Sequence, residues 1–336
     1  MNILLTFDYE LFFNETDYSE NEVLIGPTYM LDSIMSQYGI NGTFFVDMSS
    51  IVRYEQLGMS SFPIMVKEQI ETLYRRGNDI QLHTHPHWYN SYYERGKWNF
   101  DNQKYCLSSF SDAEVRSIVK HEKEQLEKML KAHHEEYSCT AFRAGGFCVQ
   151  PFKIMDSALF DAGIKVDSSI LTGGFLDNGI HRYDFRKVPR QDRYSWTMLD
   201  ENLHSINELP IGVIENKFLK FYIWKIMERL NTGELKGKPS DTKKNETQWL
   251  LKVRDRIKAA WNEPLLLCLD QIHYLAMIKA LSFIEKKNKK ASVVILMHPK
   301  FLTDPVLENF KKFIDEVKTN HSTWCFKTIR DVENDV

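Results

Sequence analysis

Short apolar runs alternate with amphipathic segments through most of this 336-residue sequence. Most of the runs are too short for helices and are bounded by glycine or polar residues, as strands are. A repeated strand–helix order predicts a parallel sheet with helices outside it, open or closed into a (β/α) barrel. We expect strands at residues 2–8, 42–47, 79–84, 139–143, 164–168, 291–297 and 323–328, with 205–211 a further candidate.

Helices are expected between these runs. Gly39 ends a segment whose apolar residues recur at helical spacing. Ser111 with Glu114 three residues later forms a capping box, which predicts the start of a long helix. The expected helices cover residues 30–35, 64–76, 111–133 and 151–162.

Polar side chains stand where most of the expected strands end. In (β/α) barrels the active groups lie at the C-terminal ends of the strands. We therefore expect the fold to bring these distant positions into one mouth. The residues at such ends are Asp8, Asp47, His83, Arg143, Asp167 and His298.

Three histidines lie within five residues at the end of the run 79–84. Imidazole is a common metal ligand, so this density predicts a metal site. If the chain turns helical here, His83 and His87 lie on one face, and Pro86 suits the first turn. If the chain stays extended, His85 shares that face and joins the site. Both geometries are open at this point.

Asp8 and Glu10 lie two residues apart at the end of the first expected strand. Alternate residues of a strand point the same way, so both carboxylates can face one site. One carboxylate can bind a metal while the other takes a proton from water, a division that suits metal-assisted hydrolysis.

The length favours one domain, residues 1–336, although residues 172–261 break the strand–helix rhythm. This stretch contains an amphipathic segment at 214–230 and a polar loop at 236–245. It is either an insertion over the barrel mouth or a helix packed on the flank of the barrel beside a solvated loop.

Charge and composition exclude some classes of function. A net charge of −3 gives no electrostatic reason to expect nucleic acid or an anionic membrane as partner, and no apolar run is long enough to span a bilayer. Five scattered cysteines without a Cys-x-x-Cys pair indicate free thiols in a reducing compartment. With an N-terminus that reads as a strand, we expect a cytoplasmic protein.

Six short motifs occur in the order seen in one enzyme family. The sequence resembles the polysaccharide deacetylases, the NodB-homology enzymes of carbohydrate esterase family four. The resemblance implies a distorted (β/α)7 barrel that uses a divalent metal to remove acetyl groups from N-acetyl sugars. The motifs are Thr6-Phe7-Asp8, Gly42-Thr43-Phe44-Phe45-Val46, His83-Thr84-x-x-His87, Phe142-Arg143-Ala144-Gly145-Gly146, Asp167-Ser168-Ser169 and Leu296-Met297-His298.

The resemblance implies a role for each matching residue. Asp8 resembles the general base, and His83 with His87 the metal-binding pair. Arg143 resembles the arginine that orients the catalytic aspartate. His298 resembles the general acid, and Asp167 the acid that positions that histidine.

One position departs from the pattern of many family members, which have a second aspartate on the metal where this chain has Tyr9. Some members read Asp-x-Asp instead, so we expect Asp8 as base and Glu10 as the third ligand. The other open assignments place Asp8 itself on the metal or make the chain an impaired or metal-free member. One divalent ion is expected, zinc by default, with nickel, cobalt and iron also compatible.

The expected function is the removal of an N-acetyl group from a surface polysaccharide or its precursor. Two alternatives stay open. His83-x-His85 can be the pair of an amidohydrolase-like barrel acting on another C–N bond, and an inactive barrel can serve for sugar binding. Aromatic residues beside the histidines are a candidate sugar-stacking wall: Trp88, Tyr89, Tyr92 and Tyr93.

Overall fold

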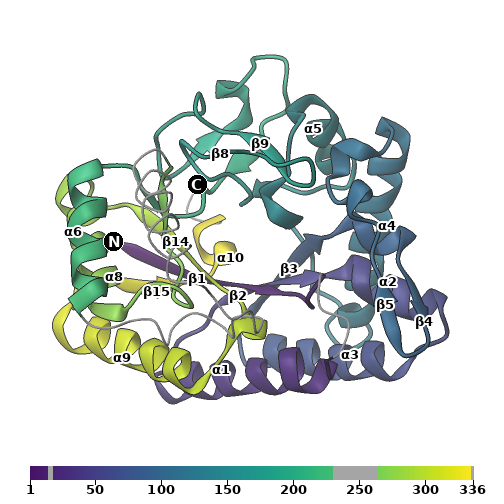
Figure 1. Ribbon diagram of the computed structural model, residues 1–336, viewed down its shortest axis with the longest axis horizontal. Helices are drawn as coiled ribbons and strands as arrows, with labels where there is room; N and C mark the ends of the chain where they lie inside the picture. The colour runs from purple at the N-terminus through teal and green to yellow at the C-terminus, as the bar shows by residue number, and fades with distance from the viewer. Residues whose placement is uncertain (14–17, 230–262, 334–336) are drawn as a thin grey trace, which may run out of the picture.

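A curled sheet of nine strands lies at the centre of the molecule, with helices on its outside (Figure 1). The computed structural model describes residues 1–13, 18–229 and 263–333. The strand order is β10-β11-β7-β6-β3-β2-β1-β14. The ninth strand, β15, pairs with the first residues of β1, whereas β2 pairs with its last residues. The strands of the sheet are β1 (Asn2–Tyr9), β2 (Thr43–Asp47), β3 (Asp79–Thr84), β6 (Ala141–Ala144), β7 (Val166–Asp167), β10 (Tyr194–Ser195), β11 (Asn207–Glu208), β14 (Ser292–Met297) and β15 (Cys325–Lys327).

All the pairings in this sheet are parallel except that of β10 with β11. Single parallel bridges join Ile211 to Val294 and Cys268 to Leu296, on the side of β14 that does not face β1. These bridges connect the chain that follows β11 to β14. The two ends of the strand order are therefore joined by isolated bridges. The expected α/β class and barrel-like curl are confirmed.

The helices follow the strands along the chain and cover the outside of the sheet (Figure 1). The Ser111–Glu114 capping box is present, and Gly39 follows α1 with φ of +60°. The helix α2, directly after β2, was not anticipated from the sequence. The helices are α1 (Gly26–Gln37), α2 (Met48–Gln56), α3 (Ser61–Arg75), α4 (Asp112–Lys131), α5 (Phe152–Asp161), α6 (Lys217–Arg229), α8 (Tyr274–Lys287), α9 (Asp304–Asn320) and α10 (Ile329–Glu333).

Short helical turns and two-stranded pairs complete the connections. Among the helices described, none combines the length and the apolar character needed to cross a membrane. The turns are η1 (Asn21–Ile25), η2 (Pro86–Asn90), η3 (Asn102–Lys104), η4 (Leu107–Ser109), η5 (Gly145–Phe147), η6 (Trp196–Met198) and η8 (Pro299–Phe301). The pairs are β4 (Tyr92–Glu94) with β5 (Lys97–Asn99), β8 (Phe175–Asp177) with β9 (Arg182–Asp184), and β12 (Val213–Ile214) with β13 (Leu265–Leu266).

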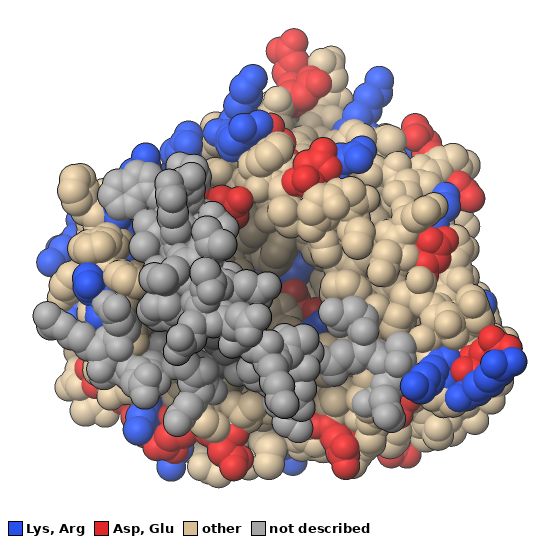
Figure 2. Space-filling model, viewed as in Figure 1, with Lys and Arg blue, Asp and Glu red and all other residues tan. Residues whose placement is uncertain are grey.

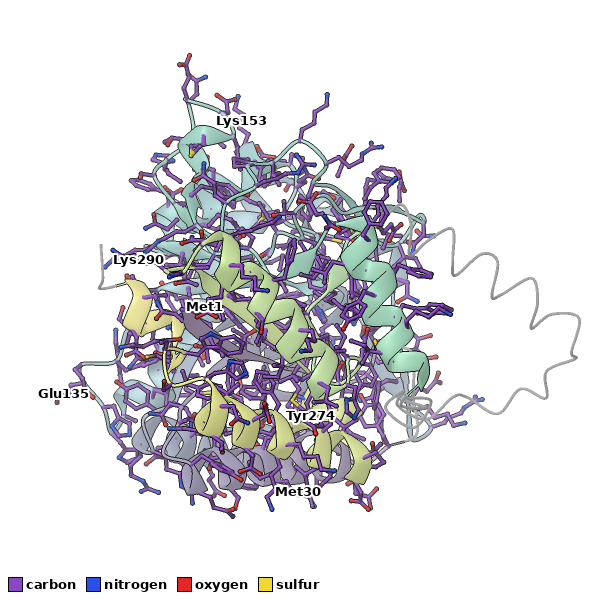
Figure 3. The ribbon with its side chains drawn as sticks, turned by 90° about the vertical axis from the view of Figure 1, so that its left-hand side faces the viewer. Met1, Met30, Glu135, Lys153, Tyr274 and Lys290 are labelled. Atoms are coloured by element: carbon purple, nitrogen blue, oxygen red, sulfur yellow. The ribbon has the colours of Figure 1, made fainter. Side chains whose placement is uncertain are left out.

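The stretch 172–261 contributes to the sheet as well as to its surroundings. Its strands β10 and β11 extend the sheet beyond β7. The helix α6 contacts α8, and the two lie on the outer side of the molecule with α9 (Figure 3). The described helix α6 therefore lies on the flank, and whether the rest of the stretch is an insertion over the mouth stays a prediction. The polar loop expected at 236–245 lies outside the described residues.

The strand register brings the polar strand ends to one level. Asp47 of β2 pairs with His83 of β3, which in turn pairs with Arg143 of β6. Glu10 directly follows β1, whose register with β2 places it opposite Asp47. Parallel strands point their carboxyl ends the same way, so these four side chains lie in one layer.

The opposite end of β3 is held by a buried carboxylate. Asp79 accepts hydrogen bonds from Thr43 Oγ1 at 3.2 Å and Gln81 Nε2 at 2.7 Å. Arg330 of α10 donates to the same carboxylate from Nη2 at 2.8 Å and from its backbone N at 3.2 Å. The carboxylate therefore ties the last helix to two central strands.

We expect Asp79→Ala to lower the free energy of unfolding by about 2–3 kcal/mol, measured by urea denaturation. Breaking a wholly buried pair costs about 3–5 kcal/mol. The expectation is lower here because the Arg330 side chain is 36% exposed, and water therefore screens the pair. The control is Glu124→Ala, which removes an exposed pair with Lys120 and should cost below about 0.5 kcal/mol. Equal losses in the two variants would contradict the structural role of Asp79.

Candidate active site

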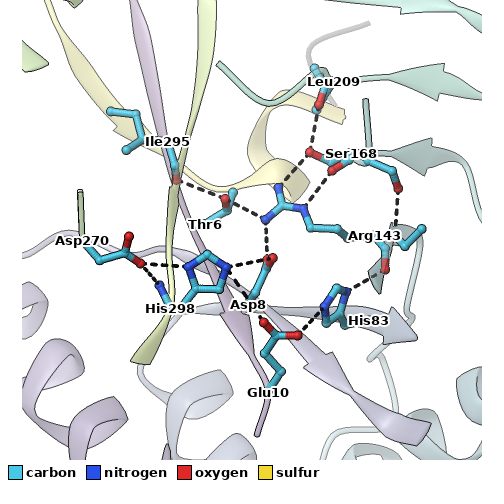
Figure 4. A network of polar contacts seen from close by, with 12 residues as sticks. Thr6, Asp8, Glu10, His83, Arg143, Ser168, Leu209, Asp270, Ile295 and His298 are labelled. Carbon is cyan, nitrogen blue, oxygen red and sulfur yellow. Dashed lines mark hydrogen bonds and ion pairs between the residues drawn. The ribbon is translucent and has the colours of Figure 1, made fainter. Parts of the chain in front are cut away.

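Three side chains of the types that bind metal ions converge at the mouth of the sheet. Glu10 Oε2 lies 3.2 Å from His83 Nε2 and 3.0 Å from His85 Nε2. The ligand atoms of these three residues all lie within 4.8 Å of one another, and all three residues are buried. Figure 4 shows Glu10 and His83 facing each other from β1 and β3, and Figure 2 shows a hollow with acidic and basic atoms at its floor on this face.

The second histidine of this group is His85, not the expected His87. The chain stays extended through β3 and at His85, whose φ and ψ are −115° and 85°, and turns only from Pro86 onward. His83 and His85 therefore point to the same side, as alternate residues of a strand do. His87 instead stacks on Tyr105, with ring centroids 5.2 Å apart and an angle of 9°. The ring nitrogens of His87 are also buried without a hydrogen bond, so the pairing of His83 with His87 as ligands stays a prediction, although His87 lies outside the group formed by Glu10, His83 and His85.

The contacts of these groups fit a metal ion. His85 is buried, yet neither of its ring nitrogens makes a hydrogen bond, although Nε2 lies close to Glu10. Buried polar atoms almost always have a partner, so an unpartnered imidazole facing a carboxylate needs an explanation. Ligands of a tetrahedral zinc ion at about 2.0–2.1 Å lie about 3.3 Å from each other. The separations of 3.0 and 3.2 Å are close to that spacing, and the 3.2 Å separation is in this structure a hydrogen bond between His83 and Glu10.

Electrostatics keep Glu10 and His85 in the forms that bind metal. Burial lowers the pKa of His83, but the hydrogen bond with Glu10 and the charges of Asp8 and Glu10 outweigh it and raise the pKa to about 9, so a metal ion would displace a proton from His83. Burial lowers the pKa of His85 well below its ordinary value, so its ring is neutral with a free lone pair. Burial raises the pKa of Glu10, but the charge of Lys300 and the hydrogen bond with His83 outweigh it and lower the pKa well below its ordinary value. Glu10 is therefore ionised at neutral pH.

Lys300 is a site residue that the sequence analysis missed. Its Nζ lies 2.8 Å from Glu10 Oε1, and its side chain is only 5% exposed. It follows His298 by two residues, in the turn η8 after β14. The sequence His298-Pro299-Lys300 could have indicated this residue, because a lysine two positions after a strand end lies near the mouth.

Tyr9 explains the departure from the family pattern. Its side chain is 1% exposed, and its hydroxyl donates to Gln69 Oε1 of α3 at 2.8 Å. It therefore points away from the mouth into the layer between β1 and α3. Glu10, the next residue, faces the histidines in its place.

Asp8 lies beside the metal group with a fixed orientation. Its Oδ1 is 2.6 Å from Arg143 Nη1, and its Oδ2 is 3.8 Å from His298 Nε2. The ligand atoms of Asp8, Glu10 and His298 also lie within 4.8 Å of one another. The structure thus brings together Asp8, Arg143 and His298 as the sequence predicts (Figure 4).

Arg143 is held on every side of its guanidinium. Besides Asp8, it donates from Nε and Nη2 to the carbonyl and hydroxyl of Ser168 and from Nη1 to Thr6 Oγ1, at 2.8–3.0 Å. The ring of Phe45 lies 4.1 Å from its Cζ. A fully buried guanidinium that makes four hydrogen bonds is a rigid support for the Asp8 carboxylate.

The partner of His298 is Asp270, another residue that the sequence analysis missed. Asp270 Oδ2 accepts from His298 Nδ1 at 2.8 Å and from its backbone N at 2.9 Å. Cys268 Sγ donates to the other oxygen of Asp270 at 2.6 Å. The apolar run ending at Asp270 has the same form as the other strand ends, which is the signal that could have identified it.

Asp167 does not position His298, contrary to the expected role. Its carboxylate accepts from the backbone N and the hydroxyl of Ser169, at 3.1 and 2.6 Å. Burial raises its pKa, and it shares a hydrogen bond with Glu208, whose pKa burial raises well above its ordinary value. This acid pair supports the turn that carries Ser168 beneath Arg143.

Asp47 lies in the same layer without a partner. Neither of its carboxylate oxygens makes a hydrogen bond, although the residue is 1% exposed. It does not cap α2, because no side-chain cap bond is present. Burial raises its pKa to about 7.

The aromatic wall expected from the sequence takes a different form. Trp88 is 1% exposed and packs on Trp98, so it cannot stack on a sugar. Tyr92 and Tyr93 lie on the exposed β4–β5 pair. The ring of Tyr105 lies against both His85 and His87, with ring centroids 5.6 and 5.2 Å apart, and Phe13 contacts His87 and Tyr105.

We expect Asp270→Asn to lower the pKa of His298, followed by NMR titration of its ring in chelator-treated protein. Burial lowers this pKa, but the charge and hydrogen bond of Asp270 raise it above its ordinary value, so removing the charge moves the titration to lower pH. Asp167→Asn is the control and should leave it unchanged. The opposite pattern would restore the role first expected for Asp167.

Known proteins resemble this chain in part of its sequence and in its fold. Residues 2–146 match the family model described as polysaccharide deacetylase. A putative polysaccharide deacetylase from Mycobacterium smegmatis is 14% identical, with 100% of this chain and 89% of that chain covered and a TM-score of 0.54. Puue allantoinase is 11% identical, with 99% and 89% covered and a TM-score of 0.50. At these identities the two structures show the fold alone.

No curated protein matches the chain. The matched residues 2–146 include Asp8, Glu10, His83 and Arg143, while His298 lies beyond them. Residues 2–146 of the chain are therefore similar to the polysaccharide deacetylase family.

Proposed function

We propose that this carbohydrate deacetylase uses one divalent metal ion to hydrolyse the N-acetyl group of an amino sugar in a surface polysaccharide or its precursor. The observation that carries the proposal is the convergence of Glu10, His83 and His85, with the unpartnered ring of His85, beside Asp8 and His298. Two imidazoles and a carboxylate leave positions open on an ion, as catalytic zinc sites do. Zinc is the ion expected first, and ligand type also admits nickel, cobalt or iron.

Asp8 is assigned as the general base that takes a proton from water. Arg143 engages Oδ1, which leaves Oδ2 directed toward the mouth. A bound ion supplies polarisation of the acetyl carbonyl and a lowered pKa for water. Because Oδ1 is engaged by a buried guanidinium, the assignment of Asp8 as base is preferred to the one that places it on the metal.

His298 is assigned as the general acid that gives a proton to the leaving amine. Asp270 accepts from Nδ1, so Nε2 is the nitrogen that faces Asp8 at 3.8 Å. The two groups that must handle protons therefore lie beside each other and beside Glu10. Acid–base assistance of this kind contributes about 10²–10⁴-fold to a rate.

A second candidate is hydrolysis of another C–N bond by a barrel of the amidohydrolase type. The observation that favours it is the His83-x-His85 pair, which faces Glu10 in the structure. Metal stoichiometry separates the candidates, because that type of site holds two ions about 3.5–4 Å apart.

We expect metal-free protein to bind one zinc or cobalt ion per chain by equilibrium dialysis. Glu10→Ala, His83→Ala and His85→Ala each remove a ligand and should abolish or strongly weaken binding. His87→Ala is the matched control and should bind close to wild type, because its ring stacks on Tyr105 outside the ligand group. Loss of binding in His87→Ala with retention in His85→Ala would return the ligand pair to His83 and His87. Two ions per chain would favour the second candidate.

We expect metal-loaded protein to release acetate from at least one member of a panel of N-acetylated sugars, and chelation to abolish the release. Asp8→Asn should lower kcat by about 10²–10⁴-fold, because the base is lost, while metal binding persists. Glu94→Gln, on the exposed β4, is the control and should keep the wild-type rate. Sugar binding without acetate release from any sugar would support the inactive barrel instead.

A further inference from the structure

A buried carboxyl lies directly behind the histidine pair. Thr84, between His83 and His85, is on the other side of the strand end, and its hydroxyl donates to Glu122 Oε2 of α4 at 2.6 Å. Glu122 is 0% exposed. The contact fixes which side of the chain faces α4, so it also fixes which side faces Glu10.

The same carboxyl reaches His85 through a second route. The backbone N–H of His85 donates to Ser49 Oγ of α2 at 3.0 Å, and Ser49 Oγ donates to Glu122 Oε1 at 2.6 Å. The hydroxyl of Tyr89, in the turn η2, donates to Oε1 at 3.1 Å. Glu122 therefore gathers three segments, α2, β3 and η2, around the residues that present the imidazoles.

We propose that Glu122 is a positioning residue for the metal site, which holds the backbone at Thr84 and His85 so that both imidazoles face Glu10. The inference rests on the proposed metal-dependent function. Residues that orient metal ligands from behind typically change metal affinity by about 10–100-fold when removed. The hydrogen bonds of Glu122 among the described residues go to Ser49, Thr84 and Tyr89, so it acts on the ligand side chains through these residues.

Its place in α4 argues against a purely structural role. Glu122 lies in the apolar stripe formed by Val115, Val119, Leu126 and Met129, where an aliphatic side chain would pack without a desolvation cost. A carboxyl retained there needs its partners to be satisfied, and three hydroxyls satisfy it. A fully connected buried network specifies one arrangement of its members.

The hydrogen bonds of Glu122 predict different effects for its replacement by glutamine and by alanine. Burial raises the pKa of Glu122 to about 8, so at neutral pH the group is largely protonated, and its O–H then donates to one of the hydroxyls of Ser49, Thr84 or Tyr89. Glutamine has the same shape and is uncharged, and its Oε1 can still accept from Ser49 and Tyr89. Alanine removes every acceptor and leaves three hydroxyls unpaired.

The experiment measures cobalt affinity and the visible absorption of the bound cobalt in metal-free protein reconstituted with Co²⁺. Glu122→Ala should weaken affinity by about 10–100-fold and change the cobalt spectrum, because the imidazoles lose their fixed orientation. Glu122→Gln should restore most of the affinity and the wild-type spectrum. Ser49→Ala, which removes only the route to the His85 backbone, should lie between them.

Asp79→Ala is the matched control, since it removes a buried carboxylate from the opposite end of β3. It should lower the melting temperature and leave cobalt affinity and spectrum unchanged. If Glu122→Ala resembles Asp79→Ala, losing stability with an unchanged spectrum and affinity, the inference is wrong. If wild-type protein itself binds no cobalt, the proposed function fails, which is a separate outcome.

If Glu122→Ala does not fold, Ser49→Ala and the milder Tyr89→Phe carry the test. Each removes one hydroxyl from the network and leaves Glu122 in place. Ser49→Ala should weaken cobalt binding more than Tyr89→Phe, because only Ser49 holds the His85 backbone. Equal wild-type affinity in both variants would overturn the inference.

Discussion

The parallel register of four neighbouring strands is the constraint on which the site depends. It places Glu10, Asp47, His83 and Arg143 at one level, although they are spread over more than 130 residues of sequence. A shift of one residue in any of these pairings would turn that strand's polar side chain out of the mouth. Buried apolar residues on both faces of the strands make such a shift costly, so the core fixes the geometry of the chemistry.

Several buried charged side chains lie together at the mouth, and none of them would be stable there without a partner of opposite charge. Arg143 and Lys300 each hold one carboxylate, Asp8 and Glu10 respectively, with contacts of 2.6 and 2.8 Å. Burying an ion is affordable only when a partner and further hydrogen bonds satisfy it. Against that rule the imidazoles of His85 and His87 and the carboxylate of Asp47 make no hydrogen bond. Of the two imidazoles, that of His85 lies beside Glu10, where a cation would satisfy it directly.

Sequence reasoning found the strands because each ends an apolar run in a polar residue, and so it found Asp8, His83, Arg143 and His298. It could not choose between His85 and His87, because the choice depends on the backbone at residues 84–86, which Thr84 and Ser49 fix from behind. Asp270 was missed because its strand-like run adjoins the irregular stretch before it. Glu122 was missed because an acid in an amphipathic helix is usually exposed, although its position in the apolar stripe was the signal.

Two buried aspartates show why position in a motif does not settle a role. Asp167 and Asp270 both follow apolar runs, but Asp167 faces Ser169 and Glu208 within the sheet, whereas Asp270 faces His298 at the mouth. An aspartate that shares a hydrogen bond with another buried acid stabilises neutral forms and so supports structure. An aspartate on an imidazole stabilises the protonated ring, which is the form that the proposed general acid needs. The two aspartates differ in role because their carboxylates contact different neighbours. The curl of the sheet determines which neighbour each one contacts.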